Sequence, residues 1–135
     1  MIRDSNLTQI ERKAIMKDTK GKPVLGLLPF EALVEVSKVR EFGIDKYGED
    51  NNWRNVAPVD FVEAALRHSH KWLDAHRGYS DRRAEDSESG INHLAHAACS
   101  LILALANIKN EEKKNIKELE AQTLYFQDLR EKGLI

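Results

Sequence analysis

The feature that most constrains the fold is a polar segment, residues 86–96, followed at once by an apolar segment, residues 97–106. Apolar residues recur through both segments at the spacing of one helical face, as Ile91, Leu94, Ala95, Ala98, Leu101, Ile102 and Leu105. The pattern predicts a helix over residues 87–109 that is buried on most sides. Unpaired polar groups inside a protein cost on the order of several kcal/mol, so the polar start of this helix predicts a binding site.

Composition narrows the class of protein. A chain of 135 residues suits a single domain, which we place at 1–135. Charged residues make up 32% of it but nearly cancel to a net charge of -1, which argues against a protein that coats nucleic acid or an anionic membrane. The only cysteine, Cys99, lies in the apolar segment, so no internal disulfide can form and a cytoplasmic location is expected. The polar N-terminus and the short apolar segment predict neither a signal peptide nor a membrane span.

Helical periodicity and helix-terminating residues predict an all-α fold, a compact bundle without strands or internal repeats. Pro29 and Pro58 suit the first turns of helices, whereas Gly48, Gly78 and Gly133 suit the positions after helix ends. Four main helices are predicted, at about 29–47, 58–77, 87–109 and 111–132, the last of them capped by Asn110.

The two ends of the chain carry weaker or more dispersed apolar patterns than its middle. Residues 1–22 carry only intermittent apolar residues and are expected to form an N-terminal arm or a short helix. Residues 110–135 contain the last helix, whose apolar residues spread over more than one face. Such a helix is expected to contact both its own bundle and another subunit.

Carboxylates on two predicted helices suggest a metal site. Glu31, Glu35 and Lys38 fall on one stripe of the helix at 29–47, and the polar side of the helix at 87–109 is expected to face this stripe. Bundles build divalent-metal sites from carboxylates on facing helices, so we expect oxygen ligands from four acids, Glu31, Glu35, Asp86 and Glu88. Oxygen ligands favour Mg²⁺ or Mn²⁺. The alternative for the stripe is a solvated face with a Glu35–Lys38 ion pair.

The histidines leave three interpretations open. His93 and His96 could ligate zinc together with His68, although the H-E-x-x-H arrangement is absent and the cysteine is isolated. They could instead order the carboxylates or bind phosphate oxygens. They could also merely form hydrogen bonds in the core, and Arg67 beside His68 could help to bind an anion.

The loop before the second predicted helix offers aromatic and basic groups. Trp53 and Arg54 could stack on a base and bind a phosphate, or could simply fill the loop. Other hydrolase templates are missing from the sequence, which has no glycine-rich phosphate loop, no G-x-S-x-G motif and no adjacent His-Asp pair of the HD type. Covalent catalysis by a nucleophilic side chain therefore has little support.

Several short motifs, taken together, resemble one enzyme family. They are Lys22-Pro23, Leu28-Pro29, Glu35, Phe42-Gly43, Lys46-Tyr47-Gly48, Asn52-Trp53-Arg54, Arg67-His68, Trp72 and Asp86-x-Glu88-Ser89-Gly90-x-x-His93-Leu94-x-His96-Ala97. Over residues 22–105 the chain resembles the phage dATP/dGTP diphosphohydrolase family, a MazG-like branch of the all-α nucleoside triphosphate pyrophosphohydrolases. It departs from the E-x-x-E and E-x-x-D pairs of the wider superfamily, because Lys38 stands three residues after Glu35. The second helix offers Glu88, Asn92, His93 and His96 instead.

The resemblance implies a helical bundle that assembles as a homodimer or homotetramer. It also implies divalent-metal-dependent cleavage of a purine (deoxy)nucleoside triphosphate between the α and β phosphates, giving the monophosphate and pyrophosphate. It favours dGTP or GTP as the substrate, with the dGMP product supplied to the synthesis of modified-purine phage DNA in the host cytoplasm.

On this hypothesis the catalytic residues are Glu35, Glu88 and Lys38, and Mg²⁺ or Mn²⁺ is held by Glu31, Glu35, Asp86 and Glu88. The substrate-binding candidates are Lys46, Tyr47, Trp53, Arg54, Arg67, His68, Asn92, His93 and His96. Trp53 or Tyr47 would stack on the base, and no nucleic-acid polymer or membrane is expected as a partner. Two alternatives are a zinc or HD-like dNTP triphosphohydrolase that uses His68, His93 and His96, and a non-enzymatic helical interaction protein.

Overall fold

The computed structural model describes residues 20–49, 52–79 and 83–135, and within them it is all-helical. Its three main helices are α2 (Phe30–Tyr47), α3 (Pro58–Arg77) and α4 (His93–Glu131). The short 3₁₀ helix η2 (Leu25–Leu27) precedes α2, and a second one, η3 (Asn52–Asn55), lies between α2 and α3. No strand occurs in these ranges, where a single isolated β-bridge pairs Glu85 with Asn92. The all-α prediction is therefore confirmed. The N-terminal arm predicted over residues 1–22 lies almost wholly outside the described residues.

The prediction of four helices is wrong, because the segments predicted at 87–109 and 111–132 form the single helix α4. Asn110, predicted as a cap, lies in its interior. No glycine or proline occurs between His93 and Glu131, and an interior asparagine destabilises a helix by only about 0.7 kcal/mol or less relative to alanine. Ion pairs on either side of Asn110, Lys109–Glu112 at 3.2 Å and Glu111–Lys114 at 3.8 Å, add local support.

The predicted ends of α2 and α3 are confirmed to within a residue. Pro29 precedes α2 and Pro58 opens α3. Proline lacks a backbone N–H, and at the start of a helix that group would have no partner within the helix. Gly48 ends α2 with φ 94°, a conformation that favours glycine, and its N–H donates to the Ile44 carbonyl at 2.8 Å. Gly78 ends α3 in the left-handed conformation.

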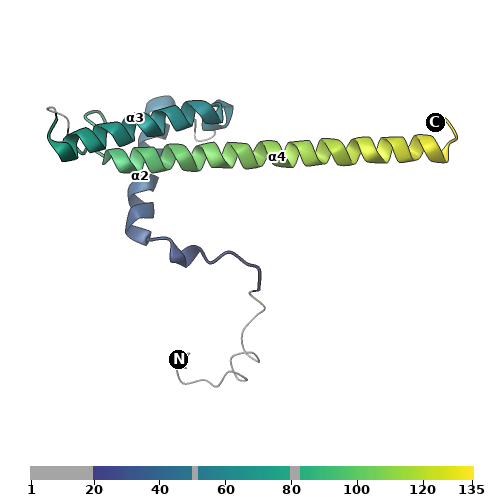
Figure 1. Ribbon diagram of the computed structural model, residues 1–135, viewed down its shortest axis with the longest axis horizontal. Coiled ribbons are helices and arrows are strands. Elements are labelled where there is room, and N and C mark those ends of the chain that lie inside the picture. Colours follow the sequence, from purple (N-terminus) through teal and green to yellow (C-terminus); the bar gives the residue numbers. More distant parts are fainter. Residues whose placement is uncertain (1–19, 50–51, 80–82) are drawn as a thin grey trace, which may run out of the picture.

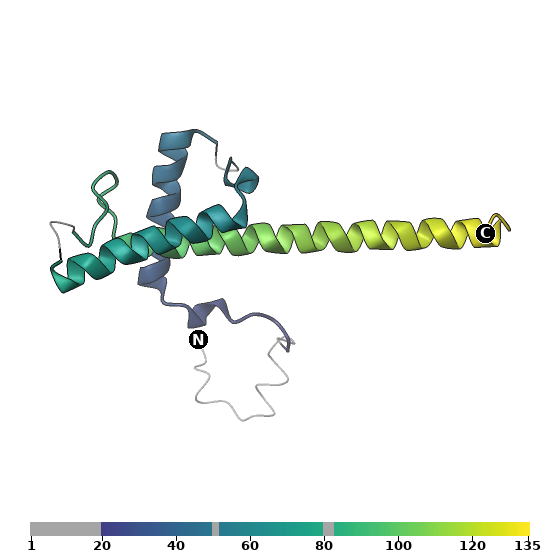
Figure 2. The same cartoon turned by 45° about the horizontal axis from the view of Figure 1, so that its top comes forward.

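The three helices meet around the N-terminal half of α4. Figure 1 shows α3 running beside that half of α4, and the two helices form the most extensive contact in the described chain. The helix α2 crosses α4 at a steep angle, as Figure 2 shows, and also packs against it. The C-terminal half of α4 continues beyond both partners, so that the molecule is a small bundle with a long helical arm (Figures 1 and 2).

The buried core consists of small side chains, namely Ala65, Ala95, Ala97, Cys99 and Ala104. Small residues let the helices approach closely, but they bury little apolar area. The expectation that the helix at 87–109 is buried on most sides is wrong for the single chain, since Leu94, Leu101 and Leu105 are 44%, 49% and 56% exposed. None of the helices in the described ranges is long and apolar enough to cross a membrane.

Candidate active site

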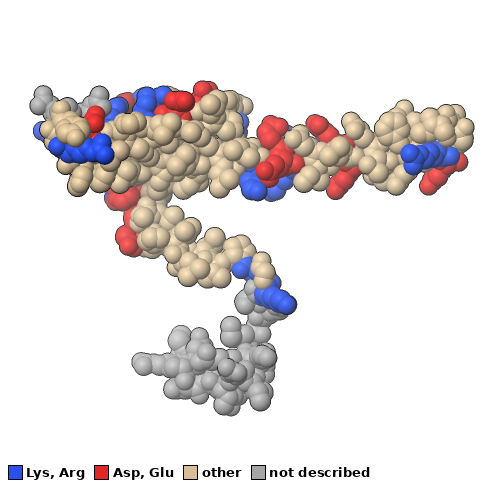
Figure 3. Space-filling model, viewed as in Figure 1, with Lys and Arg blue, Asp and Glu red and all other residues tan. Residues whose placement is uncertain are grey.

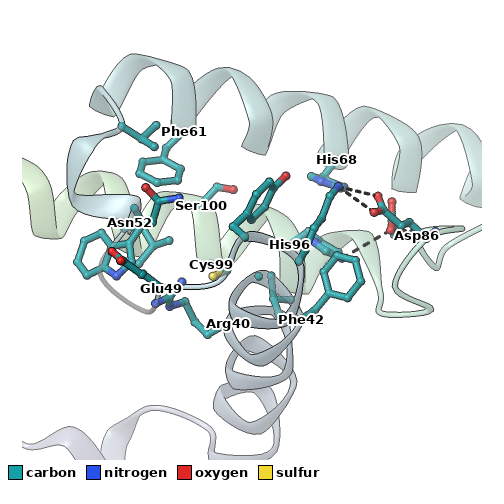
Figure 4. Close-up of a pocket in the computed structure, with 18 residues that line it drawn as sticks. Arg40, Phe42, Glu49, Asn52, Phe61, His68, Asp86, His96, Cys99 and Ser100 are labelled. Atoms are coloured by element: carbon teal, nitrogen blue, oxygen red, sulfur yellow. Dashed lines mark hydrogen bonds and ion pairs between the residues drawn. The ribbon is translucent and has the colours of Figure 1, made fainter.

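A cavity of about 400 Å³ lies where the C-terminal half of α2, the η3 segment, α3 and the start of α4 come together (Figure 4). A volume of this size suits a small-molecule ligand. Seven of the residues that the sequence predicted for the site line the cavity: Lys46, Tyr47, Trp53, His68, Asp86, Glu88 and His96. They come from every element around the cavity, so the fold brings together residues that are far apart in the sequence.

A tight turn before α4 carries the acidic end of the cavity. The Asp86 carboxylate oxygen Oδ2 accepts hydrogen bonds from the Glu88 amide at 3.2 Å, the Ser89 amide at 2.9 Å and the Ser89 hydroxyl at 3.1 Å. Gly90 closes the turn with φ 72°, and its N–H donates to the Asp86 carbonyl at 2.8 Å. Asn92 then caps α4 by accepting from the Leu94 amide at 2.8 Å.

This turn explains why α4 begins at His93 and not at residue 87. An aspartate that bonds backbone groups two and three residues on stabilises a turn in competition with a helix. The same hydrogen bonds also change the pKa of Asp86. Partial burial by itself would raise this pKa, but the hydrogen bonds from the Ser89 amide and hydroxyl outweigh burial and hold the pKa below its usual value. Asp86 is therefore a preorganised carboxylate at neutral pH.

Three histidines face this carboxylate. His68 of α3 stacks on His96 of α4 with ring centroids 4.5 Å apart, and the two Nδ1 atoms of His68 and His93 are 2.9 Å apart. One of those nitrogens carries the hydrogen and the other accepts it. His96 Nε2 lies 2.7 Å from the Ser89 hydroxyl and 4.0 Å from Asp86 Oδ2. Figure 4 shows His68 and His96 side by side with Asp86 directed toward them.

Burial favours the neutral form of these imidazoles. It is the main cause that lowers the pKa of His68 to about 4, and the neighbouring His96 and His93 lower it further. Burial also lowers the pKa of His93 and of His96. Neutral imidazole and ionised carboxylate are the forms in which these groups bind a metal ion.

The cluster of His68, Asp86 and His93 fits a divalent metal. One ligand atom from each residue lies within 4.8 Å of the others, and all three belong to the part of the chain that the structure describes. Two nitrogen donors with one carboxylate suit Mn²⁺ and the later first-row ions better than Mg²⁺, which prefers oxygen. All three were predicted as site residues; the main prediction assigned only Asp86 to the metal, whereas the zinc alternative used His68 and His93 together with His96.

The opposite end of the cavity is aromatic and basic. The Arg54 guanidinium carbon lies 4.0 Å from the centroid of the Trp53 ring, and that of Arg40 lies 5.6 Å from it. Cation–π contacts of this kind hold the indole in place. At the rim Lys46 Nζ lies 2.8 Å from the Glu88 carboxylate and 5.2 Å from the centroid of the Tyr47 ring. Hydrogen bonding to Glu88 is the main cause that raises the pKa of Lys46, and hydrogen bonding to Tyr47 raises it further.

Two residues that shape the cavity were not predicted as site residues from the sequence. The amide nitrogen of Asn107 donates to the Trp53 and Val56 carbonyls, both at 3.0 Å, and so fastens the η3 segment to α4. Asn107 could have been predicted from its position, because it is a single amide side chain in a long apolar helical segment. Cys99 also lines the cavity, and burial raises the pKa of its thiol, which argues against a role as a nucleophile.

The remaining predicted residues lie outside the cavity lining: Glu31, Glu35, Lys38, Arg54, Arg67, Asn92 and His93. Glu35 pairs with Lys38 at 2.7 Å on α2, and both side chains are about half exposed, at 47% and 51%. The C-terminal half of α2, and not the stripe of Glu31, Glu35 and Lys38, faces the cavity across from α4. Their roles as metal ligands and catalytic residues stay predictions from the sequence.

Comparison with known proteins identifies the family. A family model described as "dATP/dGTP diphosphohydrolase, N-terminal" matches residues 12–117, which include α2, α3, the turn at Asp86 and the histidine cluster. No curated protein and no solved structure gave a match. The matched span is well over half of the chain and agrees with the family that the sequence motifs predicted. The chain belongs to the dATP/dGTP diphosphohydrolase family.

Proposed function

We propose that the protein is a metal-dependent pyrophosphohydrolase that cleaves a purine (deoxy)nucleoside triphosphate, foremost dGTP or GTP, between its α and β phosphates. The products are the monophosphate and pyrophosphate, and dGMP would supply the synthesis of modified-purine DNA in a phage-infected cell. The family description supports a purine deoxynucleotide substrate and a diphosphohydrolase reaction. The observation that carries the proposal is one cavity that has Asp86, His68 and His96 at one end and an arginine-flanked indole at the other.

A divalent metal belongs to this proposal. Asp86, His68 and His93 would hold it, and the first two of these line the cavity together with Glu88. When bound, such an ion supplies Lewis acidity and lowers the pKa of a coordinated water. The imidazole donors favour Mn²⁺ over Mg²⁺, while the oxygen-ligand set predicted from the sequence allows either ion.

The protein side chains would bind and orient the two ends of the nucleotide. Trp53, held by its two arginines, and Tyr47 offer aromatic faces for the purine. Lys46 would exchange its ion pair with Glu88 for the phosphate oxygens. The Glu88 carboxylate released by that exchange is then available to accept a proton from the attacking water.

The decisive experiment combines a metal panel with product analysis. The protein is incubated with each dNTP and GTP in the presence of Mg²⁺, Mn²⁺, Co²⁺ or Zn²⁺, and the products are separated by anion exchange. The proposal requires a purine monophosphate and pyrophosphate, with the highest rate in Mn²⁺. In ¹⁸O-labelled water the label must enter the monophosphate, because attack is at the α phosphorus. Label in the pyrophosphate, or release of orthophosphate, would overturn it.

The histidine cluster favours a second candidate, a triphosphohydrolase that releases the nucleoside and triphosphate. The observation behind it is the convergence of His68 and His93 with Asp86, a donor set that transition metals favour. The same incubation separates the two functions, since the second gives triphosphate and activity only with transition metals. A non-enzymatic interaction protein would give no product with any metal and no metal-dependent thermal shift with nucleotide.

A further inference from the structure

One face of α4 is apolar along most of the helix and is left largely uncovered by the described part of the chain. In the bundle half it consists of Leu94, Ala98, Leu101, Ile102, Leu105 and Ile108, and in the arm of Ile116, Leu119, Thr123 and Phe126. We call these residues the α4 face. Its eight large apolar side chains are each between 42% and 63% exposed. An apolar surface of this length on a single chain indicates a binding surface.

The α4 face lies on the side of the helix away from α2 and α3. The side chains that α4 buries in the bundle, among them His93, His96, Ala97, Ala104 and Asn107, fall on the other side by helical periodicity. Along the arm, part of the face lines a shallow groove of about 460 Å³ with Ile116, Leu119 and Thr123 in its wall. The arm projects beyond the bundle without a neighbour in the described chain (Figures 1 and 2).

A pair of opposite charges interrupts the α4 face near its middle. Lys109 and Glu112 lie between its two apolar halves, and their side chains form an ion pair of 3.2 Å. In Figure 3 a band of charged side chains crosses the arm, with uncharged surface on both sides of it. A partner for the α4 face must therefore present apolar residues at its ends and charges near its centre.

A second copy of the same helix meets this requirement when it runs antiparallel. With a two-fold axis between residues 110 and 111, Leu105 faces the second copy's Ile116 and Ile102 faces its Leu119. In the same register Lys109 of each copy faces Glu112 of the other, so the contact contains two pairs of opposite charges. Ala98 faces Thr123, which places small side chains where the bundle and the end of the arm meet.

Other registers lose this agreement. Shifting the second helix by one turn toward its N-terminus places Leu105 opposite Glu112, and a shift of three residues the other way places Glu112 opposite itself. A parallel pair would place Lys109 against Lys109. Like charges and a buried unpaired carboxylate both oppose association.

We propose that two copies of this chain associate through an antiparallel α4–α4 contact, in which Lys109 of each copy pairs with Glu112 of the other. The contact covers the apolar halves of the α4 face in both copies at once, because a two-fold interface uses the same surface twice. It is independent of the proposed enzymatic function.

The test uses two charge reversals in the full chain. The wild-type protein is expected to sediment as a dimer in analytical ultracentrifugation, and Lys109→Glu and Glu112→Lys are each expected to shift to the mass of one chain. Mixing the two variants restores dimers, because each then meets the opposite charges of the other. Lys114→Glu is the matched control, since it also leaves two acids three residues apart on α4 but points away from the α4 face.

The proposal is overturned if the wild-type chain is monomeric at tens of micromolar, or if Lys109→Glu associates as strongly as Lys114→Glu. Failure of the mixed variants to form heterodimers overturns the register. A tetramer that splits into monomers only on charge reversal at Lys109 or Glu112 supports the contact, whereas a tetramer that ignores both reversals contradicts it. Circular dichroism of each variant shows whether helix content is kept, so unfolding is not mistaken for dissociation.

Discussion

At the scale of single residues, Asp86 connects the turn before α4 with the histidine cluster and the cavity. Asp86→Asn keeps an oxygen that can accept the Ser89 hydrogen bonds but removes the negative charge. We expect turnover of the purine triphosphate to fall by about 100-fold or more. Mutating a residue that only hydrogen-bonds to a metal ligand lowers metal affinity or activity by about 10- to 100-fold, and Asp86 is proposed as a ligand itself. Steady-state kinetics in Mn²⁺ measures this loss. Glu41→Gln, a neutralised exposed acid of α2 outside the cavity lining, serves as the control and keeps its activity.

Glu35 offers the complementary test of the sequence prediction. If Glu35 is a metal ligand, Glu35→Gln should lower turnover by orders of magnitude while leaving the helical circular dichroism unchanged. The structure shows Glu35 paired with Lys38 on the exposed part of α2. Unchanged turnover would remove Glu35 from the site and leave Asp86 as the main acid.

The histidine cluster predicts how the metal-free protein responds to acid. The pKa of His68 is about 4, lowered by burial and by His96 and His93, whereas an unfolded histidine titrates near 6.5. Between these values the unfolded chain binds more protons than the folded chain, so stability is complete above about pH 6.5 and is lost as the pH falls toward 4. Urea unfolding in EDTA across this range should show a falling midpoint, less steep in His68→Gln. A midpoint that rises on acidification would contradict the geometry of the cluster.

At the scale of secondary-structure elements, the two asparagines of α4 have opposite roles. Asn92 caps the helix through its bond to the Leu94 amide, so Asn92→Ala should lower the free energy of unfolding by about 1 kcal/mol. Asn110 lies within the helix, where alanine is the better helix former, so Asn110→Ala should raise it by about 0.5 kcal/mol. Chemical denaturation of both variants measures the two signs. A destabilising Asn110→Ala would mean that the helix begins anew at that residue.

Helix positions could be predicted where local signals are strong. Pro29, Gly48, Pro58 and Gly78 mark the ends of α2 and α3 because their backbone preferences act within one turn. The start of α4 could not be predicted from the sequence. The apolar spacing of the segment before it is typical of a helix, but the hydrogen bonds from the Ser89 and Glu88 amides to Asp86 fold that segment into a turn. The site was predicted in part for a similar reason. The sequence shows that Asp86 and three histidines are present, but only the crossing of α2 decides that Lys46 faces them and Glu35 does not.

At the scale of the whole molecule, the described chain exposes apolar surface that a compact monomer would bury. Its core is made of small residues, while Leu101, Ile102 and Leu105 are about half exposed. Sequence periodicity could show that these three residues share a helix. It could not show that α2 and α3 occupy only one side of that helix, since this depends on packing between elements.

If a second copy covers this surface, folding and association are coupled. The thermal midpoint of the wild-type protein should then rise with protein concentration, because dimerisation stabilises the folded chain by mass action. Scanning fluorimetry or calorimetry over a hundredfold range of concentration measures the shift. Lys109→Glu should show a lower midpoint with little dependence on concentration. A wild-type midpoint that is constant over this range would argue that the chain folds alone.

The steep crossing of α2 over the other two helices also bears on the order of folding. The helices α3 and α4 are neighbours in sequence as well as in space, so their contacts close a short loop and are expected to form early. The contacts of α2 with the start of α4 span a longer stretch of chain and follow later. The cavity walls that α2 contributes are therefore expected to form last. We expect bound nucleotide to slow the unfolding of α2 more than it slows the unfolding of the α3–α4 hairpin.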